Sequence, residues 1–475
     1  MDAQEYQWMD ALDLSALLRN RQVTALELMD CAIELAAERG VPLNALCYEQ
    51  FEESRVLAAS AHPRGIFGAL PFLLKDSALP SKRFAASLGS RLLKGMKFKF
   101  DATLLERFEA AGLIPFARTT VPEFCMAPTT EAVANGGPTL NPWDRSRSAG
   151  GSSGGAAVAV AAGIVALAHA NDGSGSIRIP AACCGVFGLK PSRGLTPMGP
   201  ARGEGWGGLA AEGVISRSVR DSAAALDAMA GYESGAPYAA PPQPASYCAL
   251  LTQPFERPLR IARWTHAWND IELHPACVSA VDLAVGAMRA RGHEVIDTPP
   301  PPIDYALLIE ALIDVLATNA FATAQAITGD QAPDMWRASL EPALYDACEI
   351  GRSISAARYV SAINTFHSVG RRSARHLSGF DLALTPTLSQ PPVALGTVRT
   401  DTDFRSFRRA ISRYTPFLPI CNASGQPAAN VPVHWDGGLP IGVQLIGQHG
   451  REDLILRIAA QLETDLPWKM RHPSF

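Results

Sequence analysis

The segment Ala-Gly-Gly-Ser-Ser-Gly-Gly, residues 149–155, is followed at residues 173–178 by Gly-Ser-Gly-Ser-Ile-Arg. Both segments place serines in backbone that can turn tightly, because glycine has no Cβ and tolerates positive φ. A serine nucleophile needs such room for a substrate carbonyl, together with a base and N–H groups that face the developing oxyanion. Lys75, in Leu-Leu-Lys-Asp at residues 73–76, is a candidate base. The two loops and this lysine form the candidate site of the chain.

Loops rich in glycine and serine also bind phosphate or serve as plain turns. The phosphate-loop pattern Gly-x-x-x-x-Gly-Lys-Ser/Thr is absent from both segments, and so is the dinucleotide fingerprint Gly-x-Gly-x-x-Gly after a strand. The residue pattern alone therefore leaves two interpretations open. The segments form a catalytic site, or they form a glycine-rich connection between helices.

The composition is that of an ordinary globular protein with a large core. The chain has 475 residues, of which 47% are hydrophobic and 19% charged, and this balance argues against disorder. The length is compatible with one or two domains. The formal net charge is −4, which gives no electrostatic reason to expect a nucleic-acid partner.

Targeting and redox signals favour a reducing cytoplasm. The polar, acidic residues 1–10 do not resemble a signal peptide. The longest mildly apolar run, residues 154–168, is shorter than the roughly 20 apolar residues that a membrane span needs, so we expect no membrane association. Nine cysteines are scattered, only Cys183 and Cys184 are neighbours, and no Cys-x-x-Cys pair is present. This pattern argues against a disulfide framework and against a zinc site, and we expect both neighbouring cysteines in the core.

Hydrophobic periodicity predicts alternating helices and strands. Residues 8–39 are expected to form two helices, the second capped by Thr24 and Glu27. Residues 232–258, rich in Gly, Pro, Ala and Ser, are expected to form a long surface connection. Further strands are expected at 70–75, 113–117, 259–262, 295–296, 381–386 and 441–447, and further helices at 104–112, 156–165, 274–291, 303–378 and 452–463. This alternation predicts an α/β fold with a central mixed sheet flanked by helices.

Several short motifs together resemble the amidase signature family. They are Lys-Asp at 75–76, Asn-Pro-Trp-Asp at 141–144, Gly-Gly-Ser-Ser-Gly-Gly at 150–155, Gly-Ser-Ile-Arg-x-Pro-Ala at 175–181, Gly-Val-Phe-Gly-Leu-Lys-Pro at 185–191 and Gly-Leu-Pro-x-Gly-x-Gln-Leu-Ile-Gly at 438–447. The resemblance covers residues 8–232 and 380–465. It implies a single amidase domain over residues 1–475, in which the variable helical region 233–379 covers the substrate pocket.

The resemblance implies a Ser-cisSer-Lys triad that cleaves amide bonds. Ser176 would be the acyl-accepting nucleophile, Ser152 the bridging serine on a cis peptide bond after Gly151, and Lys75 a base that burial keeps neutral. The backbone N–H groups of Gly173, Ser174, Gly175 and Ser176 would form the oxyanion hole. Neither a metal nor an organic cofactor is implied, and the partners are a small amide substrate and water.

Residues near the triad have expected roles in substrate binding or in supporting the site. Met126 and Cys125 would line the pocket or belong to the core. Asn171 precedes the nucleophile loop, and Asp172 and Arg178 would pair to fix that loop. Ser153 would hydrogen-bond Lys75 or cap the helix that starts near Gly154. His169 would pack structurally rather than form a Ser-His-acid triad. The loop 194–212 would cover the pocket.

Asn-Asp-Gly at 171–173 departs from the common Thr-Asp-Thr of the family and looks more like the branch with the nylon-oligomer cyclic-dimer hydrolases. The implied substrate is a small, largely neutral amide, either a cyclic or linear amide of an ω-amino acid or an aryl amide. Ser174 stands where that branch usually has glycine, so a positive φ there would be strained.

Three alternatives remain beside amide hydrolysis. The first is an amidotransferase subunit that supplies ammonia in a tRNA-linked complex, although Ile179 replaces the Gln typical of that branch. The second is a non-catalytic relative, against which the intact Lys75, Ser152 and Ser176 argue. The third is an esterase, because the same acyl-enzyme chemistry accepts esters. The choice between a monomer and a homodimer is open.

Overall fold

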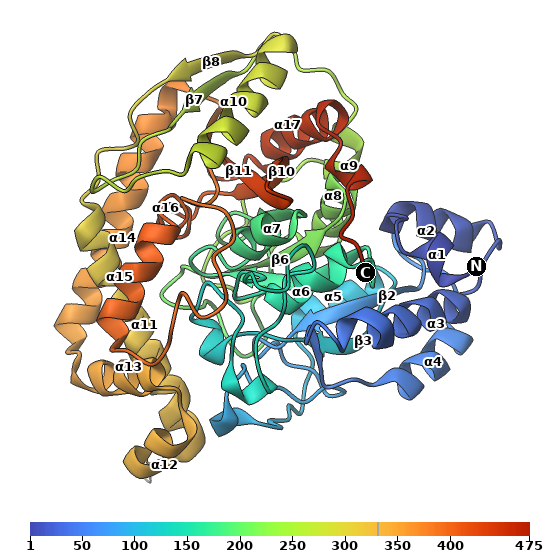
Figure 1. Cartoon of the computed structure of the whole chain (residues 1–475), viewed down its shortest axis with the longest axis horizontal. Helices are drawn as coiled ribbons and strands as arrows, with labels where there is room; N and C mark the ends of the chain where they lie inside the picture. The colour runs from blue at the N-terminus through green and yellow to red at the C-terminus, as the bar shows by residue number, and fades with distance from the viewer. Residues whose placement is uncertain (330–331) are drawn as a thin grey trace.

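Two β-sheets form the centre of the computed structural model, which describes residues 1–329 and 332–475 (Figure 1). The larger sheet runs in the order β4 (Leu167–Asp172), β6 (Ala211–Ser216), β5 (Phe187–Lys190), β10 (Ala428–Asp436), β11 (Leu439–Gly447), β9 (Leu382–Pro386), β7 (Arg260–Arg263) and β8 (Glu294–Asp297). Neighbours are antiparallel from β4 to β9, and β9, β7 and β8 are parallel. The predicted mixed sheet is therefore confirmed.

The smaller sheet carries the candidate base at the end of its edge strand. Its order is β1 (Leu46–Cys47), β3 (Leu113–Thr119) and β2 (Leu70–Lys75), and β2 runs parallel to β3. Every residue of β2 is buried, as expected for an apolar run covered on both faces. Strand β2 packs beside β4 of the larger sheet, so the ends of two strands from different sheets meet at Lys75.

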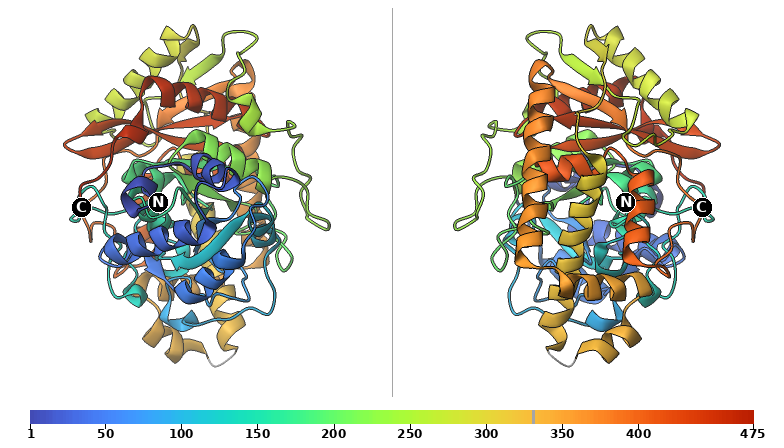
Figure 2. Two further views of the ribbon diagram at one scale, coloured as in Figure 1. Left: turned by 90° about the vertical axis from the view of Figure 1, so that its right-hand side faces the viewer. Right: turned by 90° about the vertical axis from the view of Figure 1, so that its left-hand side faces the viewer.

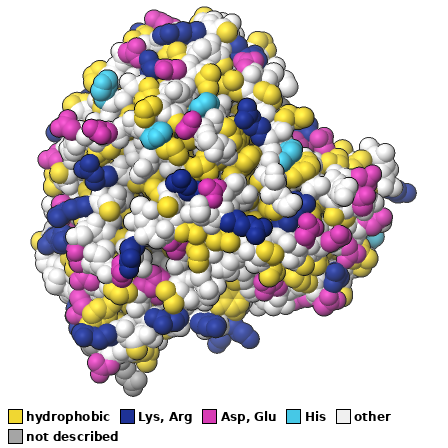
Figure 3. Space-filling view, in the orientation of Figure 1, with side chains coloured by type: hydrophobic (Ala, Val, Ile, Leu, Met, Phe, Trp, Pro, Cys, Tyr) yellow, Lys and Arg dark blue, Asp and Glu magenta, His cyan; other side chains and the backbone are white. Residues whose placement is uncertain are grey.

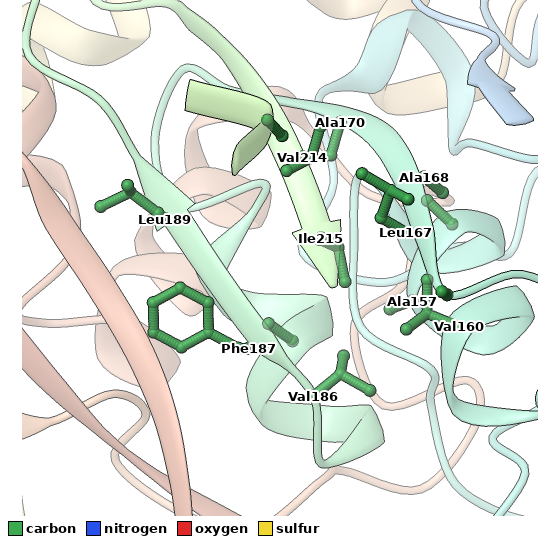
Figure 4. Close-up of a cluster of buried hydrophobic side chains, with 14 of the residues drawn as sticks. Ala157, Val160, Leu167, Ala168, Ala170, Val186, Phe187, Leu189, Val214 and Ile215 are labelled. Carbon is green, nitrogen blue, oxygen red and sulfur yellow. The ribbon is translucent and has the colours of Figure 1, made fainter. Parts of the chain in front are cut away.

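Helix α6 (Gly154–Ala161) packs against strands of both sheets, and all of its residues are buried. Figure 4 shows Ala157 and Val160 of this helix beside Leu167 of β4, with Ile215 of β6 nearby. The predicted all-apolar helix in the core is confirmed. Its small side chains allow the close approach that two sheets around one helix require.

The N-terminal helices lie beside the small sheet, on the right of Figure 1. They are α1 (Ala3–Tyr6), α2 (Ala11–Arg19), α3 (Ala25–Leu35) and α4 (Phe51–Ser60). Thr24 and Glu27 form the predicted capping box at the start of α3, with the Glu27 N–H donating to Thr24 Oγ1 over 3.2 Å. The two helices expected over residues 8–39 are thus present as α2 and α3, and a short π-helix at Ala36–Gly40 follows them.

The segment 303–378 is helical as predicted and forms much of one side of the molecule (Figure 2, right). It contains α11 (Tyr305–Thr328), α12 (Ala332–Ser339), α13 (Pro342–Ser353) and α14 (Ala356–His376), while residues 330–331 lie outside the described residues. Helix α11 is long and apolar enough to cross a membrane, but 56% of its most apolar window is buried in the fold. Because it packs against α13 and α14, we interpret it as a core helix.

The other helices are α5 (Thr103–Ala110), α7 (Arg178–Cys184), α8 (Val219–Met229), α9 (Tyr247–Leu250), α10 (Pro275–Ala290), α15 (Phe404–Tyr414), α16 (Pro419–Ser424) and α17 (Glu452–Asp465). Among these helices, α5, α10 and α17 agree with predicted ranges, whereas α7, α8, α15 and α16 were not predicted. The predicted surface connection 232–258 contains α9, whose Tyr247 is buried. Ser246 caps this short helix, a local signal hidden among the Pro and Gly residues.

We expect Phe187→Ala to destabilise the protein by about 3–5 kcal/mol, because Phe187 is fully buried and its removal leaves a cavity between the sheet and its helices. The measurement is the urea unfolding midpoint of the variant and of the wild-type protein. Leu307→Ala is the control, since Leu307 is 53% exposed and its loss should cost less than about 0.5 kcal/mol. Equal midpoints for the two variants would contradict this account of the core.

Candidate active site

The three residues of the expected triad come together from three elements. Lys75 ends β2, Ser152 lies in the loop before α6, and Ser176 lies between β4 and α7. Lys75 Nζ is 2.8 Å from Ser152 Oγ, and both side chains are buried. The peptide bond between Gly151 and Ser152 is cis, as expected. The fold thus brings residues 77 positions apart into hydrogen-bond contact.

Lys75 is surrounded by neutral oxygens. Its Nζ donates to Asn171 Oδ1 over 2.6 Å and to the Asn171 backbone oxygen over 3.2 Å. Burial lowers the pKa of Lys75, although Cys125, Glu212 and Asp172 act in the opposite direction. A neutral amine has two N–H groups and one lone pair. In such an amine the two Asn171 oxygens would accept both N–H groups, and the lone pair would be left for the hydroxyl of Ser152.

Ser176 opens on a cavity of about 460 Å³ that Ser152 and Asn171 also line. Its backbone oxygen accepts from the Ser153 N–H over 3.3 Å, which ties the two serine loops together. Among the residues that the structure describes, nothing hydrogen-bonds the Ser176 hydroxyl. This hydroxyl is therefore free to approach a bound substrate.

Asp172 and Arg178 form the predicted ion pair, which fixes the nucleophile loop. Arg178 Nε donates to Asp172 Oδ2 over 2.9 Å, and both side chains are fully buried. The same carboxylate accepts the backbone N–H groups of Gly175, at 2.6 Å, and Ile177, at 3.2 Å. Burial raises the pKa of Asp172, but the adjacent Arg178 outweighs this effect and holds it well below its ordinary value. The backbone on both sides of Ser176 is thus hydrogen-bonded to one ionised carboxylate.

The expected oxyanion hole requires one correction. The N–H of Gly175 donates to Asp172 and does not face the cavity as a free donor. Within the described part of the chain, the N–H groups of Gly173, Ser174 and Ser176 have no hydrogen-bond acceptor. The positive φ in this loop falls on Gly175, at 114°, so Ser174 carries no such strain.

Gly173 is required by close packing in the cavity wall. A Cβ at this position would lie 2.4 Å from the ring of Trp206. Trp206 belongs to the loop 194–212, which also contributes Met198, Ala201 and Arg202 to the cavity lining. The loop that we expected to cover the pocket therefore forms part of the cavity wall.

The remaining walls are mostly apolar. Met126 and Cys125 line the cavity, and helix α11, within the segment 233–379, contributes Asn319 and Ile327 to its lining. Aromatic and aliphatic side chains complete the wall; they include Leu88, Met96, Phe98, Phe100 and Phe124.

Ser153 does not play either of its expected roles. Its hydroxyl donates to the backbone oxygen of Asn171 over 3.4 Å, neither bonding Lys75 nor capping α6. The backbone of the adjacent loop directs the hydroxyl toward β4 instead.

His169 is buried and packs structurally, as predicted. Its Nδ1 accepts the backbone N–H of Lys75 over 3.2 Å, and its Nε2 lies 3.0 Å from Glu212 Oε2. Cys183 and Cys184 are buried at the end of α7, which confirms their expected place in the core.

Sequence reasoning missed Glu212, the last residue of the predicted loop 194–212. It lies inside β6, is almost fully buried and lines the cavity. A single carboxylate within the apolar run Ala-Glu-Gly-Val-Ile at 211–215 was the available signal, because a buried charge needs specific partners.

Comparisons with known proteins agree with this geometry. The Amidase family model matches residues 36–456. A 6-aminohexanoate-cyclic-dimer hydrolase of Paenarthrobacter ureafaciens is 33% identical over 98% of this chain and 97% of its own length. The structure of a 6-aminohexanoate cyclic dimer hydrolase complexed with substrate superposes with a TM-score of 0.91 at 31% identity, covering 98% of this chain and 99% of that one. A bacterial aryl acylamidase structure gives a TM-score of 0.88 at 26% identity, covering 98% of both chains.

These matches define the class as enzymes that hydrolyse amide bonds. The chain belongs to the amidase signature family. The match also extends through residues 233–379, which the motifs left outside the resemblance.

We expect Asp172→Asn to destabilise the protein by about 3–5 kcal/mol near neutral pH, because it leaves Arg178 buried without its partner charge. The folded-state pKa of Asp172 is depressed, so the stability contributed by its ionised form is present above its unfolded value and is lost as the pH falls below that value. The gap between wild-type and variant unfolding midpoints should therefore narrow below about pH 4. A gap that stays constant from pH 7 to pH 3 would contradict this role.

Proposed function

We propose that this chain hydrolyses the carbon–nitrogen bond of a small, largely neutral amide through an acyl-enzyme on Ser176. The observation that carries the proposal is the contact between buried Lys75 Nζ and Ser152 Oγ at 2.8 Å, next to a serine that opens on the cavity. A lysine that burial keeps neutral is a base, and the intervening serine hydroxyl can receive one proton while it donates another.

In the acylation step, Ser176 Oγ attacks the amide carbonyl carbon. Its proton passes to Ser152 as the Ser152 proton passes to Lys75 Nζ. The free N–H groups of Gly173, Ser174 and Ser176 are the donors available to the tetrahedral oxyanion. When the carbon–nitrogen bond breaks, Ser152 gives its proton to the departing amine and regains one from Lys75.

In the deacylation step, water takes the place of the amine. The relay of Ser152 and Lys75 removes a proton from the water as it attacks the ester carbonyl of the acyl-enzyme. The second tetrahedral intermediate collapses by breaking its bond to Ser176, which is reprotonated through the same relay. The products are a carboxylic acid and an amine, and no step requires a metal or an organic cofactor.

The mostly apolar cavity supports a largely neutral substrate of modest size. Its volume of about 460 Å³ and its aromatic and aliphatic walls favour a cyclic or linear ω-amino-acid amide or an aryl amide. Two relatives in the comparisons are a cyclic-dimer hydrolase and an aryl acylamidase, and these substrate types are therefore the first to test.

We expect a fluorophosphonate probe to label Ser176 stoichiometrically, because the relay activates this hydroxyl for attack on an electrophile. Peptide mapping by mass spectrometry identifies the labelled residue. Lys75→Ala should lose labelling and amide hydrolysis while keeping its far-ultraviolet circular dichroism. Ser176→Ala has no hydroxyl to label, and its amide hydrolysis should fall by about 10³-fold or more. Labelling of the Lys75→Ala variant at the wild-type rate would overturn the relay. No adduct on folded wild-type protein would favour the complex-subunit or non-catalytic alternatives.

The rate should rise with pH until Lys75 is deprotonated. Because burial lowers the pKa of Lys75, the acidic limb of kcat/KM is expected to have its midpoint below 10.5, the ordinary value for lysine. A pH profile with one of the amides named above measures this limb. A midpoint at or above the ordinary lysine value would show that burial does not supply the neutral base.

The cytoplasmic location, the absence of nucleic-acid and membrane partners, the single-domain organisation and the choice between monomer and homodimer stay predictions from the sequence. On the face seen in Figure 3, Lys and Arg side chains are mixed with Asp and Glu.

A further inference from the structure

Glu212 of β6 contacts two side chains of β4, the strand that precedes Ser176. In the antiparallel register of β4 and β6, Glu212 stands directly opposite Asn171. Side chains alternate along a strand, so His169 and Asn171 lie on the same face of β4. Glu212 Oε2 is 3.0 Å from His169 Nε2, and Glu212 Oε1 accepts from Asn171 Nδ2 over 3.5 Å. One buried carboxylate thus contacts both side chains.

Each of these two side chains continues to Lys75. His169 Nδ1 accepts the backbone N–H of Lys75 over 3.2 Å. Asn171 Oδ1 accepts from Lys75 Nζ over 2.6 Å. Glu212 is therefore connected to both ends of the same lysine, its backbone and its amine.

The hydrogen bonds assign the protonation of His169. Since Nδ1 accepts, the ring proton is on Nε2, which donates to Glu212. Burial lowers the pKa of His169, which agrees with a neutral ring, even though Glu212 acts in the opposite direction. Burial raises the pKa of Glu212, but the contact with His169 and the nearby Arg202 outweigh this effect, so the carboxylate is ionised.

The contact with Glu212 also decides which way the Asn171 amide points. An ionised carboxylate accepts only, so the Asn171 amide must present its NH₂ group to Glu212 and its oxygen to Lys75. A flipped amide would place NH₂ against the lysine amine and remove one acceptor. With the oxygen in place, both N–H groups of a neutral Lys75 are engaged by Asn171, and the lone pair is directed at Ser152.

We propose that Glu212 is a positioning residue for the amidase reaction, which orients Asn171 and His169 so that the lone pair of Lys75 faces Ser152. This inference rests on the proposed function, in which Lys75 is the terminal base. Glu212 acts through its two neighbours and does not touch the reacting atoms.

The charge of Glu212 gives the inference a signature that packing alone does not produce. A carboxylate near Lys75 stabilises the ammonium form, so removing its charge should lower the pKa of Lys75 further. Arg202 Nη2, 3.7 Å from Glu212 Oε1, partly balances this charge. A Glu212 variant leaves the other titratable or charged groups around Lys75 unchanged. These groups are Cys125 in the cavity wall, Asp76 after β2, Arg118 of β3, and His169 and Asp172 of β4.

The test is the variant Glu212→Gln, with fluorophosphonate labelling of Ser176 and kcat/KM both measured against pH. Glutamine keeps the size, but its NH₂ faces one of the two donors, so one contact is lost. We expect acylation to slow by about 10- to 100-fold with KM changed little, because the lysine lone pair is misdirected. We also expect the acidic limb to move to lower pH. A variant with lower stability but an unmoved acidic limb would overturn the proposal and leave Glu212 a structural residue.

Glu452→Gln is the matched control. Glu452 is also a fully buried carboxylate, accepting the Ser192 N–H over 2.6 Å, but it does not line the cavity. This variant should keep the wild-type midpoint for the acidic limb of kcat/KM and the wild-type rate of Ser176 labelling. If Glu212→Gln fails to fold, Asn171→Leu tests the same contact from the other side: it should slow labelling of Ser176 by a similar factor, and an unchanged rate would overturn the proposal.

The two proposals fail in different ways. Wild-type protein that folds and is not labelled at Ser176 would overturn the proposed function. Wild-type protein that is labelled, together with a Glu212→Gln variant that has the wild-type rate and pH profile, would overturn only the role of Glu212.

Discussion

A lysine amine held out of water is the constraint around which this active-site region is built. The low-polarity surroundings of Lys75 disfavour the ammonium form, and its nearest partners are the neutral oxygens of Ser152 and Asn171 rather than a carboxylate. The nearby charges act at longer range: Asp172 is neutralised by Arg178, and Glu212 reaches the lysine through Asn171. A directly paired carboxylate would keep the lysine protonated, so this separation favours a base over a salt bridge.

The glycine-rich loop around Ser176 needs a second, independent support, because glycine-rich backbone loses much conformational freedom on folding. The carboxylate of Asp172 supplies that support by accepting two backbone N–H groups and two guanidinium contacts. Arg178 in turn donates to Asn422 and Gln444, which belong to α16 and β11. The loop is therefore fastened to elements from the C-terminal part of the chain, and the cavity acquires its fixed shape from both halves of the sequence.

Much of the architecture follows from local patterns. Apolar runs predicted β2, α6 and β11. The capping box predicted the start of α3. The motifs also located the candidate triad, since serine in glycine-rich loops and a lysine at a strand end are visible without a structure. The hydrogen-bond partners of individual polar groups were harder to predict from the sequence. The engagement of the Gly175 N–H by Asp172, the direction of the Ser153 hydroxyl and the burial of Glu212 all depend on neighbours distant in the sequence or on loop geometry that no pattern encodes.

Residue types and their spacing along the chain were thus enough to identify the family and the α/β fold and to propose the chemical groups of the candidate site, because these depend on periodicity and on short motifs. The two-sheet arrangement, the meeting of β2 with β4, and the register that sets Glu212 opposite Asn171 came only with the tertiary structure. The physical reason is that strand pairing and hydrogen-bond direction join residues tens to hundreds of positions apart. In the proposed mechanism, Lys75 is a base only because those distant neighbours remove its water and direct its lone pair.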